Sequence, residues 1–81
     1  MNTFEEITQK IQNYISGSTV KIVNEASAHH GNNDYGLHIR VEVKSKAFEG
    51  KSLIEQHKMI QQALKDEIGG RIHSLSIKTS I

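Results

Sequence analysis

The five histidines of this chain are the residues best suited to chemistry. The 81 residues contain no cysteine, so the chain alone can form neither a disulfide nor a thiolate metal site. Soft-metal chemistry would have to use imidazole, or a thiolate that another molecule supplies. The sequence also lacks a G-x-S-x-G motif and a phosphate-cradling glycine loop, and these absences argue against an enzyme.

His73 has the most favourable position among the histidines. It follows Gly69 and Gly70, near the start of a strand predicted over residues 72–79. A strand would hold the imidazole rigidly at the accessible rim of a sheet, as a metal ligand requires. Strand alternation places it on the face of Leu75 and Ile77. That placement leaves a second interpretation open, in which His73 is a core histidine bonded to a backbone carbonyl.

The other histidines fall into two groups. His29 and His30 lie in a polar loop over residues 25–36, and loops of this length are more often functional than short ones. They suit a second ligand, although an ordinary exposed loop histidine would look the same. His57 falls on the apolar face of a predicted helix and is expected to be packed. His38 is expected on the water-facing side of a strand.

The elements that must position these residues follow from hydrophobic periodicity. Helices are predicted over residues 3–16 and from Ser52 to about Ile68, the second with a Ser52–Glu55 capping box. Strands are predicted over residues 19–23, 37–44 and 72–79. The first two strands can form an antiparallel hairpin, and the third can join the second by a parallel crossover. The sequence therefore predicts one α+β domain over residues 1–81, in two layers, with the helices on one face of a three-stranded mixed sheet.

Two of these elements carry clear apolar patterns. In residues 37–44 the apolar side chains alternate strictly, and the four polar ones, including His38, are expected to face water. On the second helix, one face is predicted to be buried. Its members are Leu53, His57, Ile60, Leu64 and Ile68.

Composition limits the partners of this chain. The formal net charge is only +1, which gives no global electrostatic case for nucleic acid or acidic membranes. No apolar run is long enough for a transmembrane helix, and the N-terminal residues lack a secretory pattern, so a cytoplasmic location is expected. Four lysines could still reach phosphates: Lys44, Lys46, Lys51 and Lys58. Acidic residues are interleaved with them, and the G-x-x-G loop of KH domains is absent, so only weak, salt-sensitive binding is expected.

An ordered set of short motifs resembles the BolA family. After the loop histidines come H-I-x-V-x-V-x-S from His38, F-x-G-K-S from Phe48, Q-H-K-M-I from Gln56 and I-H-S-L-S-I-K-T from Ile72. The likeness extends over residues 20–79. It implies a class II KH-like αββαβ fold. Two departures are Ala26, where many members have serine, and Gln56, where arginine is common.

The resemblance also implies a partner and a cofactor. BolA-like proteins bind monothiol glutaredoxins as heterodimers and can share a 2Fe–2S cluster that glutathione also ligates. The matching ligand positions here are His73 and His29, with His30 as the substitute for His29. These residues would replace one cysteine and one glutathione of a cluster-bridged glutaredoxin dimer. A KH-like nucleic-acid-binding transcriptional regulator is the alternative, and the free chain is expected to be a monomer or a weak dimer.

Overall fold

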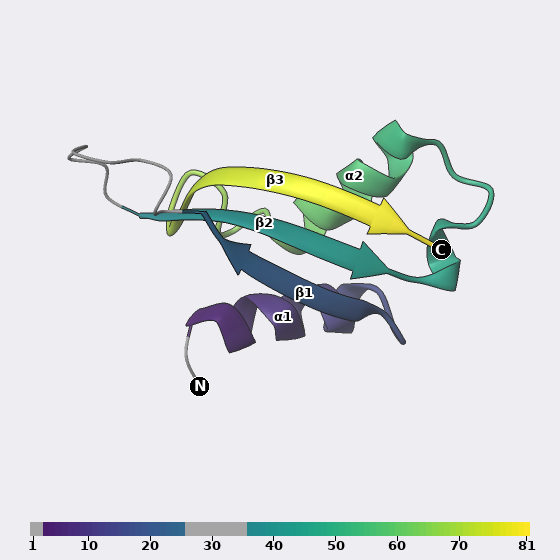
Figure 1. Cartoon of the computed structure of the whole chain (residues 1–81), viewed down its shortest axis with the longest axis horizontal. Helices are drawn as coiled ribbons and strands as arrows, with labels where there is room; N and C mark the ends of the chain where they lie inside the picture. The colour runs from purple at the N-terminus through teal and green to yellow at the C-terminus, as the bar shows by residue number, and fades with distance from the viewer. Residues whose placement is uncertain (1–2, 26–35) are drawn as a thin grey trace.

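The chain folds in the predicted order of helix, two strands, helix and strand. The computed structural model describes residues 3–25 and 36–81. Its helices and strands are α1 (Thr3–Tyr14), β1 (Thr19–Asn24), β2 (Leu37–Lys44), the 3-10 turn η2 (Lys46–Phe48), α2 (Leu53–Ala63) and β3 (Ile72–Ser80). β2 is the central strand, antiparallel to β1 and parallel to β3. Both helices lie behind the sheet in Figure 1 and leave its front face open. The predicted α+β fold is therefore confirmed.

The core lies between the sheet and the two helices. Alternation in β2 places Ile39, Val41 and Val43 on the helix side, where each is at most 1% exposed. The other buried apolar residues come from every layer. They are Ile7, Ile11, Ile15, Phe48, Ile60, Leu64 and Ile72. The predicted core face of β2 is thus confirmed.

Both helices end earlier than their apolar patterns predict. α1 ends at Tyr14, whose side chain is 55% exposed. α2 ends at Ala63 with Leu64 as its C-cap, not near Ile68. Beyond Leu64 the Glu67 carbonyl accepts the backbone N–H groups of residues 70 and 72 at 3.1 and 2.9 Å, which turns the chain out of the helix.

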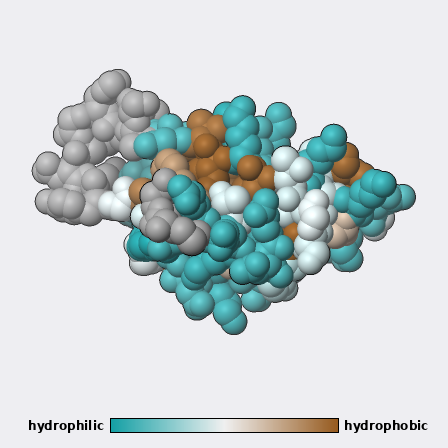
Figure 2. Space-filling view, turned by 90° about the horizontal axis from the view of Figure 1, so that it is seen from below, coloured by the Kyte–Doolittle hydropathy of each residue, from teal (hydrophilic) through white to brown (hydrophobic). Residues whose placement is uncertain are grey.

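The apolar face predicted for α2 is correct only in its middle. Ile60 and Leu64 are fully buried, but Leu53 is 64% exposed and Ile68 is 42% exposed. Leu53 begins the helix directly after its cap, and Ile68 lies in the turn beyond the helix end, so neither reaches the core. In the view of Figure 2 the surface is largely hydrophilic, with apolar side chains in separate small areas.

Gln56 joins α2 to its neighbours. Its side chain is 8% exposed, and its Nε2 donates to the carbonyls of Lys51 at 2.8 Å and Phe48 at 3.4 Å. Its Oε1 accepts a hydrogen bond from the Thr79 hydroxyl of β3. The predicted Ser52–Glu55 capping box is present. The glutamine that departs from the family pattern is therefore a buried structural residue.

Candidate functional site

The start of β3 is held by backbone hydrogen bonds of the two residues that precede His73. The Ile72 N–H donates to the Glu67 carbonyl at 2.9 Å, and the Leu37 N–H donates to the Arg71 carbonyl at 2.8 Å. These bonds join the turn after α2 to the first residue of β2. His73, the second residue of β3, therefore projects from a fixed backbone.

A β-bulge at this point overturns the predicted alternation of β3. Leu37 of β2 pairs with Ile72, but the next residue, His38, pairs with Ser74. Two residues of β3 thus oppose one step of β2, and His73 is the extra residue. Ile72 is 1% exposed in the core, although alternation predicted it on the opposite face from Leu75. The bulge lets Ile72 and Leu75 both pack on the helix side while His73 is exposed.

The bulge brings two imidazoles together. The ring centroids of His38 and His73 are 5.2 Å apart, and the ring planes are tilted by 55°. His38 is only 7% exposed, so the prediction that it faces water is wrong. Alternation gave its side of the strand correctly but could not show that this end of the face is covered. The pair consists of one buried and one exposed imidazole at the rim of the sheet.

Gly36 makes room for His73, and the sequence analysis did not single it out. Its φ is +100°, a backbone conformation that glycine adopts readily. A Cβ at this position would lie 3.3 Å from the Cβ of His73 and 3.2 Å from the Arg71 carbonyl oxygen. The position therefore needs glycine both for its backbone conformation and for its contact with His73.

An ion-pair network ties the turn before His73 to α1. Glu67 binds Lys10 through one carboxylate oxygen and Arg71 Nε through the other, both at 2.7 Å. Arg71 also binds Glu6 at 2.7 Å. These contacts, with the Arg71 hydrogen bond foremost and Lys10 second, lower the pKa of Glu67 from its usual 4.5 to about 2. The same contacts raise the pKa of Arg71. The network fixes the backbone from which β3 begins.

The other predicted ligands, His29 and His30, lie outside the described residues. His57 is half-buried on α2, as a packed histidine should be. Within residues 3–25 and 36–81, no group of three or more His, Cys, Asp or Glu side chains could hold a metal ion. The described residues alone therefore provide no complete metal site around the His38–His73 pair.

The four lysines predicted to contact nucleic acid lie from the end of β2 to α2. Lys44 and Lys46 line a hollow of about 410 Å³ beside the end of β2. Lys51 and Lys58 instead lie near Glu55 of α2. The pKa of Glu55 is lowered chiefly by its hydrogen bonds with Ser52, and to a smaller degree by these two lysines. Nucleic-acid binding by these four lysines stays a prediction.

Comparison with known proteins agrees with this architecture. The family model described as BolA-like protein matches residues 11–81. Human BolA-like protein 1 is 33% identical over 72 residues, which is 89% of this chain and 53% of the human protein. A protein of Vibrio cholerae named DNA-binding transcriptional regulator BolA is 30% identical over 73 residues, covering 90% of this chain and 69% of that protein. The chain thus spans only about half the length of its human relative.

Solved structures show the same fold. BolA1 from Arabidopsis thaliana superposes with a TM-score of 0.81 at 25% identity, covering 99% of this chain and 92% of that one. The described residues contain no helix long and apolar enough to cross a membrane. With a family match over nearly all of its length and the same arrangement of helices and strands, this chain belongs to the BolA-like protein family.

Proposed function

We propose that this chain is a non-enzymatic partner of a monothiol glutaredoxin and that it contributes His73 to a shared 2Fe–2S cluster. The observation that carries the proposal is the placement of His73, an exposed imidazole on a fixed strand start. A ligand for a centre shared between two proteins must be both accessible and rigidly held. His73 combines these properties.

The donor set of this chain fits a shared centre. Iron–sulfur clusters usually bind thiolates, but imidazole can replace thiolate on one iron, with a higher reduction potential. This chain has five histidines and no cysteine, so it can supply imidazole while glutaredoxin and glutathione supply sulfur. Imidazole binds a metal in its neutral form, and acidification is therefore expected to release the centre.

His38 has a separate role in this proposal. Its buried ring lies beside that of His73, so it restricts the orientations that the exposed imidazole can adopt. We assign His38 as a positioning residue. The second ligand is proposed to be His29, with His30 as the alternative.

A nucleic-acid-binding regulator is the second candidate function. It is favoured by the name of the Vibrio cholerae relative, a DNA-binding transcriptional regulator. Against it, acidic residues are interleaved with the four predicted lysines, and the sequence lacks the G-x-x-G clamp motif of KH domains. The glutaredoxin hypothesis is therefore preferred.

The test is a titration of the chain into cluster-loaded monothiol glutaredoxin, followed by visible absorption and circular dichroism. A new spectrum is expected at one-to-one stoichiometry, and His73→Ala should abolish it. His57→Ala is the matched control, because it removes an imidazole that lies on α2 and is not part of the His38–His73 pair. Complex formation by gel filtration without any spectral change, or a spectrum unaffected by His73→Ala, would refute ligation by His73.

A further inference from the structure

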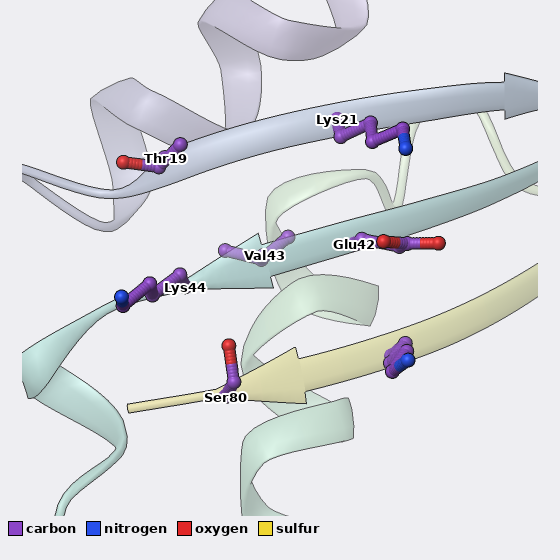
Figure 3. A pocket seen from close by; sticks show the side chains of 7 residues that line it. Thr19, Lys21, Glu42, Val43, Lys44 and Ser80 are labelled. Atoms are coloured by element: carbon purple, nitrogen blue, oxygen red, sulfur yellow. The ribbon is translucent and has the colours of Figure 1, made fainter.

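We propose that the open face of the sheet binds a phosphate group at the end opposite the histidines. The site lies over the last residues of β2 and β3 and the first residues of β1. A hollow of about 190 Å³ is present there, lined by Thr19, Lys21, Glu42, Val43, Lys44, Lys78 and Ser80. Figure 3 shows that its polar side chains lie on the face of the sheet turned away from the helices.

Strand register assembles this site from all three strands. Lys21 of β1 is paired with Glu42 of β2, which is paired with Lys78 of β3. In the next row, two residues along β2, Lys44 is flanked by Thr19 and Ser80. The two rows are neighbours on one face because alternate residues of a strand point the same way. Three lysines and two hydroxyls therefore surround one hollow.

The charges of the site are unbalanced. Among the described residues that line it, Glu42 is the one acid. Glu42 binds Arg40 Nε at 3.1 Å, and Arg40 also binds Glu25 at 3.4 Å, so the charge of Glu42 is compensated in part. Within the described parts of the chain, Lys21, Lys44 and Lys78 form no ion pair. Like charges on adjacent strands repel one another, and a bound anion would relieve that repulsion.

Phosphate chemistry matches these donors. A phosphate group presents several acceptor oxygens and at least one negative charge, so it can accept hydrogen bonds from ammonium and hydroxyl groups together. Thr19 and Ser80 offer hydroxyls that have no hydrogen bond to the described residues. The source of the phosphate can be a free phosphate or the phosphodiester backbone of a single-stranded nucleic acid.

The site is independent of the proposed metal ligand. His38 and Lys44 are six positions apart on β2, which corresponds to about 20 Å along an extended strand. His73→Ala is therefore expected to leave phosphate binding unchanged. Failure of the cluster hypothesis and failure of this inference are thus separate experimental results.

The experiment is an NMR titration of the ¹⁵N-labelled chain with inorganic phosphate and, separately, with an eight-nucleotide oligothymidylate. The Lys21→Gln/Lys78→Gln variant removes two of the three cations. Gln61→Glu/Lys65→Gln changes the net charge equally but alters exposed residues outside the hollow. Saturable shifts are expected at residues 19, 21, 78 and 80. The Lys21→Gln/Lys78→Gln variant should weaken binding roughly fivefold, because each exposed charge contact contributes about half a kcal/mol. The control variant should weaken it less than twofold.

The two ligands distinguish the sources of phosphate. Saturable binding of inorganic phosphate supports a site for free phosphate. Binding of the oligonucleotide alone supports a site for the phosphodiester backbone of a nucleic acid. The logarithm of its binding constant should then fall with the logarithm of the salt concentration, with a slope of about −2 for three lysines and about −0.7 after loss of two. Equal weakening by both double variants, or no saturable shift with either ligand, would overturn the proposal.

Discussion

The buried imidazole of His38 lies 5.2 Å from the exposed imidazole of His73, with the ring planes tilted by 55°. This contact depends on the bulge that makes His73 an extra residue between the partners of Leu37 and His38. In the proposed function, His73 is the cluster ligand and His38 restricts its orientation. The role of His38 can be tested without altering His73.

His38→Leu keeps a side chain of similar size at this position and removes the imidazole. We expect the variant to bind apo-glutaredoxin with unchanged affinity, measured by calorimetry, because His38 is buried. The circular dichroism of the shared cluster should change in shape, because the orientation of His73 is less restricted. A purely structural role for His38 would leave the spectrum of the folded variant identical to that of the parent chain.

Gly36→Ala is expected to disturb the histidine site directly. The substitution places an alanine at a positive φ and brings its Cβ close to His73. The free energy of unfolding should therefore fall by roughly 2–3 kcal/mol. Gly50→Ala is the control, since Gly50 also has a positive φ but has no atom near its added Cβ. Gly50→Ala should lower the free energy of unfolding by only about 1 kcal/mol. Thermal denaturation and the NMR shift of His73 measure the difference, and equal effects of the two variants would contradict the proposed contact.

Stability should fall in acid through Glu67. The pKa of this carboxyl group is about 2 in the folded chain and 4.5 as its reference value. The stabilisation that the ionised Glu67 carboxylate gives the fold is therefore complete above pH 4.5 and is lost as the pH falls toward 2. Glu67→Gln should cost about 2 kcal/mol at neutral pH and flatten the dependence of stability on pH in that window. Urea denaturation at several pH values measures this effect.

The control for that experiment is Glu49→Gln. Glu49 is exposed and has no ion pair with the described residues, so its replacement should change stability by less than about 0.5 kcal/mol. Identical pH profiles for the two variants would show that the ion pairs of Glu67 contribute nothing to stability.

Gln56→Ala should be among the more damaging substitutions in α2. It removes the hydrogen bonds to Lys51 and Phe48 and leaves the Thr79 hydroxyl without its partner. We expect a loss of about 2–3 kcal/mol in the free energy of unfolding. The exposed Gln61 of the same helix offers the comparison, and Gln61→Ala should cost less than about 0.5 kcal/mol. A small effect of Gln56→Ala in denaturant titrations would contradict the anchoring role.

The sequence was sufficient to predict the fold because its strongest local signals agree with the tertiary structure. Strict alternation located β2, and the Ser52–Glu55 pair located the start of α2. Alternation could not reveal the bulge, since an extra residue is recognised only when a strand is compared with its neighbour. For the same reason it placed His73 with Leu75. It left His38 in water because alternation gives the side of a strand and not whether that side is covered.

The site was predictable only in part. Motif likeness singled out His73, whereas the role of Gly36 depends on an approach between residues that are 37 positions apart. The end of α2 was missed because Ile68 continues the helical spacing after the backbone has turned. Gln56 was judged by its difference from a family pattern, but its burial and its bond to Thr79 appear only after folding.

The ion pair between Glu6 and Arg71 joins residues that are 65 positions apart. During translation, α1 leaves the ribosome long before residues 67–73 are synthesised, so Glu6 and Lys10 must wait for Arg71 and Glu67. The ion pairs beside the strand start that carries His73 therefore form only when these distant segments meet. A nascent chain has no organised His38–His73 pair before residues 67–74 have been synthesised.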